Sequence, residues 1–80
     1  MISELRQANK VVGAKQVRRA LGDRRASKLF FAADADPRIT EPLVQLAEEQ
    51  DVLVEKAASM KELGAACSIA VGSAVAALLG

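Results

Sequence analysis

Several residue types that carry much of protein acid–base and metal chemistry are missing from this chain. Its 80 residues include no histidine, tryptophan or tyrosine, and its two aromatic residues are Phe30 and Phe31. Without histidine, His-based acid–base catalysis and the usual His-containing metal sites are excluded. Domains that bind single strands by stacking bases on several exposed rings are disfavoured as well.

Cysteine and net charge are also scarce. The single cysteine, Cys67, cannot form an internal disulfide, and no apolar signal segment follows Met1, so we expect a cytoplasmic protein. The net charge is only +1, with a pI of about 7.9. Any affinity for a polyanion must therefore come from a local patch of charge.

The chain carries no charge from Leu63 to its end. Ser68, Gly72 and Ala76 stand at the four-residue spacing of a small-residue helix seam, which leaves a membrane-spanning helix as an alternative. However, the stretch barely reaches spanning length, is mostly Ala, Gly and Ser, and has no basic flank or interfacial aromatic. We expect a helix end, a loop and a buried strand there, and no membrane contact.

Short apolar runs alternate with helical patterns along the whole chain. Ser3 can cap a first helix through Asn9, with Leu5 and Ala8 facing inward, and Thr40 can cap a helix with Pro42 in its first turn. Further helices are predicted over 13–21, ended by a glycine at 22, and over 60–67, with a capping box at 59 and 62. Strands are predicted over 11–12, 28–33, 52–55 and 74–79. This alternation predicts a single α/β domain over residues 1–80, with helices on both faces of one sheet.

The segment from Gly13 to Arg19 is the strongest candidate for binding. A glycine follows a β-branched pair, and a helical pattern with one apolar stripe begins at once. A helix N-terminus presents free N–H groups to anions, and Gly13 lets a ligand backbone approach without meeting a Cβ. The side chains left on the exposed side are Lys15, Gln16, Arg18 and Arg19.

Basic residues crowd the first third of the chain, where only Glu4 and Asp23 oppose them. Spacing alone leaves two interpretations open, an RNA-binding patch or a solvated helix face. The basic residues are Arg6, Lys10, Lys15, Arg18, Arg19, Arg24, Arg25 and Lys28.

Other candidate groups have simpler explanations. Asp34 and Asp36 flank a turn, which accounts for both without a cation, and Cys67 is best explained as a small packed thiol. The five glycines are too scattered to form a phosphate loop. We therefore predict no enzymatic activity, no metal and no cofactor.

Four blocks in this order resemble the kink-turn-binding ribosomal protein family of the L7Ae/L30e type, and in particular its short bacterial members of the YbxF type. The resemblance covers about residues 9–79. The blocks are Val-Val-Gly-Ala-Lys-Gln-Val-x-Arg-Ala-Leu at 11–21, Ala-Asp-Ala-Asp-Pro at 33–37, Ser-Met-Lys-Glu-Leu-Gly-x-Ala-Cys at 59–67 and Ile-x-Val-Gly-Ser-Ala at 69–74.

The resemblance implies a three-layer α/β/α sandwich with a single mixed four-stranded sheet, and recognition of kink-turn RNA, a sharply bent RNA with tandem sheared G·A pairs beside a bulge. It implies that Gly13 and Ala14 approach the RNA backbone. Lys15, Gln16 and Arg19 would reach base edges and phosphates in the widened major groove. Asp36 and Lys61 would border a pocket for a flipped-out base. The bulge nucleotides would lie on the loop Ile69, Ala70, Val71, Gly72 and Ser73.

In one respect the chain departs from the family. Archaeal and eukaryotic members carry Asn-Glu where this chain has Lys15-Gln16, and lysine donates hydrogen bonds but accepts none. We therefore expect binding here to depend more on charge and less on base edges.

The expected partner is structured RNA, ribosomal or regulatory, bound by a monomer. Two alternatives remain open at this point, an RNA-recognition appendage or partner of an rRNA-modifying enzyme, and a protein–protein adaptor.

Overall fold

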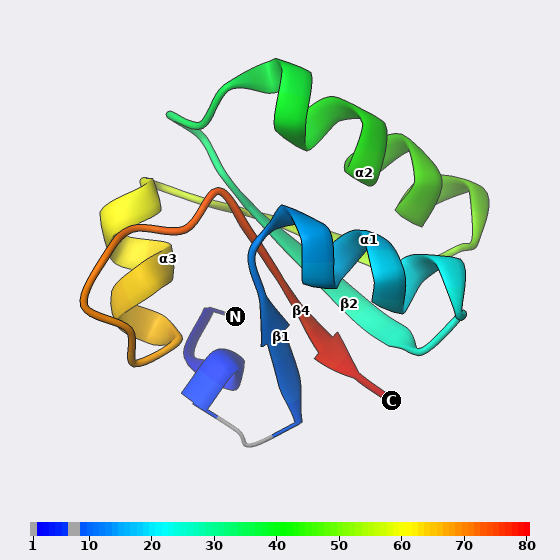
Figure 1. Ribbon diagram of the computed structural model, residues 1–80, viewed down its shortest axis with the longest axis horizontal. Coiled ribbons are helices and arrows are strands. Elements are labelled where there is room, and N and C mark those ends of the chain that lie inside the picture. Colours follow the sequence, from blue (N-terminus) through cyan, green and yellow to red (C-terminus); the bar gives the residue numbers. More distant parts are fainter. Residues whose placement is uncertain (1, 7–8) are drawn as a thin grey trace.

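In the computed structural model, which describes residues 2–6 and 9–80, helices alternate with strands (Figure 1). One sheet contains β1, β4, β2 and β3 in that order. β2 and β3 are parallel, whereas β4 is antiparallel to β1 and to β2, so the sheet is mixed. The elements are η1 (Ile2–Arg6), β1 (Lys10–Val12), α1 (Ala14–Gly22), β2 (Ala26–Ala32), α2 (Pro37–Glu49), β3 (Leu53–Ala57), α3 (Met60–Ala66) and β4 (Val75–Leu79).

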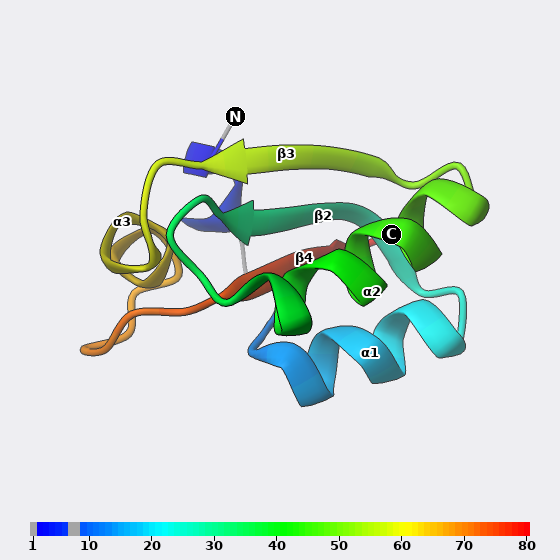
Figure 2. The same ribbon diagram turned by 90° about the horizontal axis from the view of Figure 1, so that it is seen from above.

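Helical segments pack on both faces of the sheet. The central strands contribute apolar side chains to both faces, because successive residues of a strand point to opposite sides. Leu29 and Val75 pack in the layer of α1 and α2, and the next residues, Phe30 and Ala76, pack in the layer that holds Leu5 of η1 and part of α3. Figure 2 shows α1 and α2 side by side along one face of the sheet. The three-layer α/β/α sandwich predicted for this sequence is therefore confirmed.

Strand register gathers the starts of all three α-helices at one end of the sheet. Val12 of β1 lies opposite Ala76, next to the start of β4, and the last residues of β2 and β3 are paired with each other. The carboxyl ends of β1, β2 and β3 and the loop that enters β4 thus meet at this end, which we call the carboxyl edge. Open α/β sheets usually bind their ligands at such an edge.

The start of α2 differs from the prediction. The helix begins at Pro37 rather than after Thr40, because the carboxylate of Asp36 caps it by accepting the Arg38 N–H at 2.9 Å. Pro37 occupies the first turn, where its missing N–H costs nothing, and Pro42 lies inside the helix. Thr40 is buried, with 5% of its surface exposed. Asp36 and Thr40 are both suitable N-cap residues, and the helix begins after the first of them.

Other element boundaries shift by a few residues. The first helix is a short 3₁₀ segment that ends at Arg6, so Asn9 is outside it, and the prediction for Ala8 lies outside the described residues. α1 continues to Gly22, and α3 stops at Ala66. β2 begins two residues earlier than predicted, and β3 extends two residues further.

The uncharged C-terminal stretch does not form one helix. It is divided among the end of α3, a loop and the buried strand β4, as predicted. Within the ranges 2–6 and 9–80, no helix is long and apolar enough to span a bilayer.

Candidate nucleic-acid interface

Gly13 sets the conformation at the start of α1. Its φ of 95° lies in the left-handed region, which favours glycine, and it occupies the N-cap position without a side-chain cap. A Cβ built on Gly13 would meet no atom within 4 Å. The glycine therefore serves the backbone turn and leaves the space in front of the helix start open to a ligand.

The first turn of α1 contains no acidic residue, so nothing there offsets the positive end of the helix dipole. Val17, Ala20 and Leu21 are buried, which confirms the predicted apolar stripe. Among the described residues, no ion pair or hydrogen bond occupies the side chains of the opposite face. A depression of about 280 Å³ on that face is lined by Lys15, Gln16, Arg18 and Arg19.

The loop between α3 and β4 presents apolar side chains at the same carboxyl edge. Val71 is 71% exposed, and Ile69 is partly exposed. The loop is held against α3, because the Ile69 N–H donates to the Gly64 carbonyl at 3.1 Å and the Ser73 N–H donates to the Met60 carbonyl at 3.0 Å. The exposed side chains therefore stand on a fixed backbone.

Two glycines permit this close packing. A Cβ on Gly64 would lie only 2.2 Å from the Val71 carbonyl oxygen, a distance that real side chains do not adopt. A Cβ on Gly72 would lie 3.1 Å from the backbone and the Cβ of Met60. Gly72 thus lets the loop pack tightly on α3, in addition to any role in the approach of a ligand.

The backbone carbonyl of Val75 joins the loop to the start of α1. It accepts the Gly13 N–H at 3.0 Å and the Ser73 hydroxyl at 2.7 Å. Ser73 is buried, so its side chain faces this internal bond instead of solvent. Ser73 therefore contributes to a binding surface by positioning the loop between α3 and β4.

The turn after β2 completes the edge, although its two carboxylates are already engaged. Asp34 accepts the Met60 N–H at 2.7 Å, which places the turn against the start of α3, where Lys61 is exposed. Asp36 caps α2 and forms a 2.8 Å ion pair with Arg38. The Arg38 guanidinium, followed by the Arg38 N–H, lowers the pKa of the Asp36 carboxyl. The Asp36 carboxylate is therefore presented together with the exposed Arg38 side chain.

The basic residues of the first third do not form one patch. Lys28 lies on the opposite face of the sheet from α1 and binds Glu4 at 2.6 Å and Glu55 at 3.0 Å. Arg25 pairs with Asp23 at 3.5 Å beyond the far end of α1. Three members of the cluster, Lys15, Arg18 and Arg19, line the depression on α1 together with Gln16.

Some residues of this edge were not among the sequence candidates. Arg18, which the sequence placed on the exposed side of α1 but without a contact to RNA, lines the depression. Met60 is 37% exposed beside the loop, but nothing in the local sequence indicated that the loop would pack on it. The described residues contain no cluster of three metal-ligating side chains, and Cys67 is buried, which raises the pKa of its thiol.

The chain was compared with known protein families and with known proteins. The sequence model of the ribosomal protein L7Ae/L30e/S12e/Gadd45 family matches residues 2–79. The chain belongs to this family. RNA-binding protein YbxF of Geobacillus stearothermophilus is 47% identical over 74 residues, which cover 91% of this chain and 90% of that protein. An RNA-binding protein of Geobacillus sp. strain WCH70 has the same identity and coverage.

Two solved structures have the same architecture. The Giardia lamblia 15.5kD RNA binding protein superposes with a TM-score of 0.87 at 26% identity, over 99% of this chain and 68% of that one. A Bacillus halodurans protein of unknown function superposes with a TM-score of 0.85 at 16% identity, which supports the fold alone.

Proposed function

We propose that this L7Ae/L30e-family protein is a non-enzymatic RNA-binding protein that recognises kink-turns in ribosomal or regulatory RNA. The start of α1 enters the distorted major groove at the tandem G·A pairs, with Lys15, Gln16 and Arg19 reaching base edges and phosphates. The exposed part of the loop 69–72 contacts the bulge nucleotides. The names of the bacterial relatives and of the Giardia protein support binding to RNA.

One observation carries the proposal. The Val75 carbonyl fixes an acid-free helix start beside an apolar loop, through hydrogen bonds from Gly13 and Ser73. Ordinary A-form RNA has a major groove too narrow for side chains, so a helix can enter it only where the RNA is distorted. An apolar loop next to that helix suits unstacked bases. A kink-turn offers both features within a few nucleotides.

The cationic character of the helix start sets the balance between affinity and specificity. Lys15, Arg18 and Arg19 lack ion-pair partners among the described residues, so their charge is available to phosphates. At exposed sites such contacts are strongly dependent on salt. Gln16 is the side chain of the four that can both donate to and accept from base edges. Base readout by the helix should therefore depend on Gln16.

The proposal is tested by titrating the protein with a kink-turn RNA and with the same RNA after its G·A pairs are replaced by Watson–Crick pairs. We expect the intact kink-turn to bind more tightly at every salt concentration. Equal affinity for the two RNAs would mean that the protein binds RNA only through charge.

The loop is tested with Val71→Asp, because Val71 is exposed and its side chain can change without disturbing α3. A carboxylate there would face phosphates and should weaken binding while the melting temperature stays near that of the wild type. Gly72→Asp is less informative, since its Cβ would press on Met60. Unchanged RNA affinity in Val71→Asp would remove the loop from the interface.

A further inference from the structure

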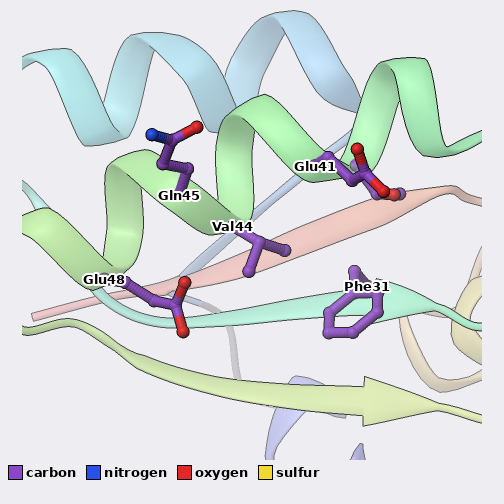
Figure 3. A pocket seen from close by; sticks show the side chains of 6 residues that line it. Phe31, Glu41, Val44, Gln45 and Glu48 are labelled. Atoms are coloured by element: carbon purple, nitrogen blue, oxygen red, sulfur yellow. The ribbon is translucent and has the colours of Figure 1, made fainter.

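A second cavity lies on the other side of α2 from the proposed RNA interface. This groove has a volume of about 360 Å³ and lies between α2 and the sheet (Figure 3). It falls in the size range of ligand sites. Figure 3 shows Phe31 and Glu48 on the side of α2 away from α1, and Gln45 on the side toward α1. Its lining consists of Phe31, Thr40, Glu41, Val44, Gln45 and Glu48.

The groove combines an apolar floor with two carboxylates. Phe31 and Val44 are only half-buried between α2 and the sheet, and Figure 3 shows Glu41 and Glu48 toward opposite ends of the groove. Seven residues separate the two acids, which corresponds to about 10 Å along the helix. Among the described residues neither acid has an ion-pair partner. The groove therefore fits two positive charges flanking an apolar group.

The acidic residues do not serve the helix that carries them. Glu48 lies in the last turn of α2, where the helix dipole disfavours negative charge, and α2 has no acid in its first turn, where acids would stabilise it. Lys56 stands next to Phe31 in the strand register but does not line the groove and pairs with neither acid. No described side chain forms an ion pair with Glu41 or Glu48.

Thr40 adds a polar group to the lining of the groove. Only 5% of its surface is exposed, and its hydroxyl makes no hydrogen bond with a described group. No fully buried polar side-chain atom in the described structure lacks a partner, so this hydroxyl keeps its access through the groove that Thr40 lines. An unpaired hydroxyl in such a position costs stability unless a ligand or water completes it.

The spacing of the lining residues matches a helix-packing seam. Thr40, Leu43 and Ala47 face the sheet, and the next strip of α2 contains Glu41, Val44 and Glu48, at intervals of three and four residues. On this face of β3, Val54 is half-buried and Lys56 is exposed, so α2 leaves the edge strand partly uncovered. A second helix beside α2 would cover Val54.

We propose that this groove binds a basic amphipathic helix of a partner protein. The helix lies alongside α2 and over β3, with an apolar side chain on Phe31 and Val44. Lysine or arginine side chains seven residues apart on the partner pair with Glu41 and Glu48, as charged positions flank the seam of paired helices. The RNA-binding surface at the carboxyl edge stays free, so the protein would join RNA to this partner.

The test uses a designed, alanine-rich helical peptide of about 20 residues, long enough to be helical in water. It carries leucines on one face and two arginines seven residues apart. A peptide of the same composition in scrambled order is the control for charge alone. Amide chemical shifts of the labelled protein are followed during titration with each peptide. We expect saturable shifts at Phe31, Val44 and Glu48 with the ordered peptide only.

Variants separate the groove from diffuse attraction. Glu41→Gln/Glu48→Gln should weaken the peptide roughly three- to tenfold, and Glu49→Gln, an exposed acid on the same helix outside the groove, should change affinity less than about twofold. None of these variants should alter kink-turn affinity.

Several results would overturn the proposal. These are the absence of saturable shifts, equal binding of the scrambled peptide, equal losses in Glu49→Gln and the double variant, or shifts centred on another surface. If the groove resonances move with protein concentration alone, a second copy of the chain covers the groove and no basic partner helix is needed.

Discussion

At the scale of single residues, the main distinction is between side chains that are free to bind and side chains that the fold already uses. Lys15 in the first turn of α1 and Arg19 in its last turn are exposed and have no protein partner among the described residues. Ser73 occupies the same edge but donates its hydroxyl to the Val75 carbonyl. Proximity to the interface therefore does not by itself make a residue a contact.

Removal of Lys15 or Arg19 should each cost about 1–3 kcal/mol of kink-turn affinity, if each reaches a guanine edge or a buried phosphate. Arg24→Ala is the matched control, since Arg24 lies in the turn after α1, about 13 Å along the helix from the carboxyl edge. It should cost less. Titration of one kink-turn RNA against the three variants measures this, and an equal loss at Arg24 would indicate a diffuse basic surface.

At the scale of elements, the packing of the loop 69–73 on α3 decides the effect of glycine substitutions. In an open helix, Gly→Ala stabilises by roughly 0.5–1 kcal/mol. Gly22→Ala in α1 should follow this rule, because a Cβ there meets nothing within 4 Å. Gly64→Ala should have the opposite sign, because its Cβ would force the Val71 carbonyl away.

Thermal unfolding and RNA titration of these two variants test the role of the loop together. We expect Gly22→Ala to raise the melting temperature and to keep RNA affinity. Gly64→Ala should lower the melting temperature and weaken RNA binding, because the loop can no longer pack closely on α3. A Gly64→Ala protein of wild-type affinity would show that the loop position is not important for binding.

The short helix η1 is attached to the sheet by charge as well as by Leu5. The Lys28 ammonium, which binds the Glu4 carboxylate, lowers the pKa of Glu4, and the same contact raises the pKa of Lys28. A carboxyl with a lowered folded-state pKa contributes stability that is present above its unfolded pKa and lost as the pH falls through the folded pKa. The lysine contribution is present below its unfolded pKa and lost as the pH rises through its raised pKa.

Glu4→Gln should therefore be less stable than the wild type at neutral pH. The difference should shrink as the pH falls below the usual carboxyl range of about 4. Thermal unfolding of both proteins across this range checks the prediction, with Glu49→Gln as the control for an exposed acid. A difference that does not change with pH would mean that the ion pair does not hold η1.

Local signals in the sequence predicted the helices and strands well where they acted alone. Ser59 caps α3 as expected by accepting the Glu62 N–H at 3.0 Å, and the stripe of α1 is buried as expected. The predicted start of α2 was wrong because Asp36 and Thr40 are both suitable caps. In the structure Asp36 accepts the Arg38 N–H, and Thr40 is buried within the helix. Contacts between distant segments, such as Lys28 with Glu4 or Gly64 with Val71, had no local signal.

At the scale of the whole molecule, the net charge is close to zero but its distribution is uneven. α1 carries lysine and arginine on its outer face, and α2 beside it carries glutamates. RNA should therefore be attracted to the α1 side and repelled from the α2 side. Attraction of this kind falls as salt rises, with a slope that reports the number of phosphates neutralised.

Exchange of Lys15-Gln16 for the Asn-Glu pair of archaeal and eukaryotic family members should change affinity and specificity in opposite directions. Lys15→Asn/Gln16→Glu takes the net charge from +1 to −1, so duplex RNA should bind more weakly and with a shallower salt slope. The new side chains can accept hydrogen bonds, so the preference for intact G·A pairs should rise. Titrations at several salt concentrations test both, and a lower preference ratio would contradict the assignment of base contacts to this pair.

The most direct test of the central claim, that the start of α1 reads the G·A pairs of a kink-turn, is a double-mutant cycle between protein and RNA. Gln16→Ala removes an amide without changing charge, and replacement of the G·A pairs by Watson–Crick pairs removes its proposed partner. Four titrations at one salt concentration give the coupling free energy between the two changes. We expect Gln16→Ala to cost about 1–3 kcal/mol with the intact kink-turn and much less with the disrupted RNA. An equal cost with both RNAs would contradict the account and leave the start of α1 as a phosphate anchor only.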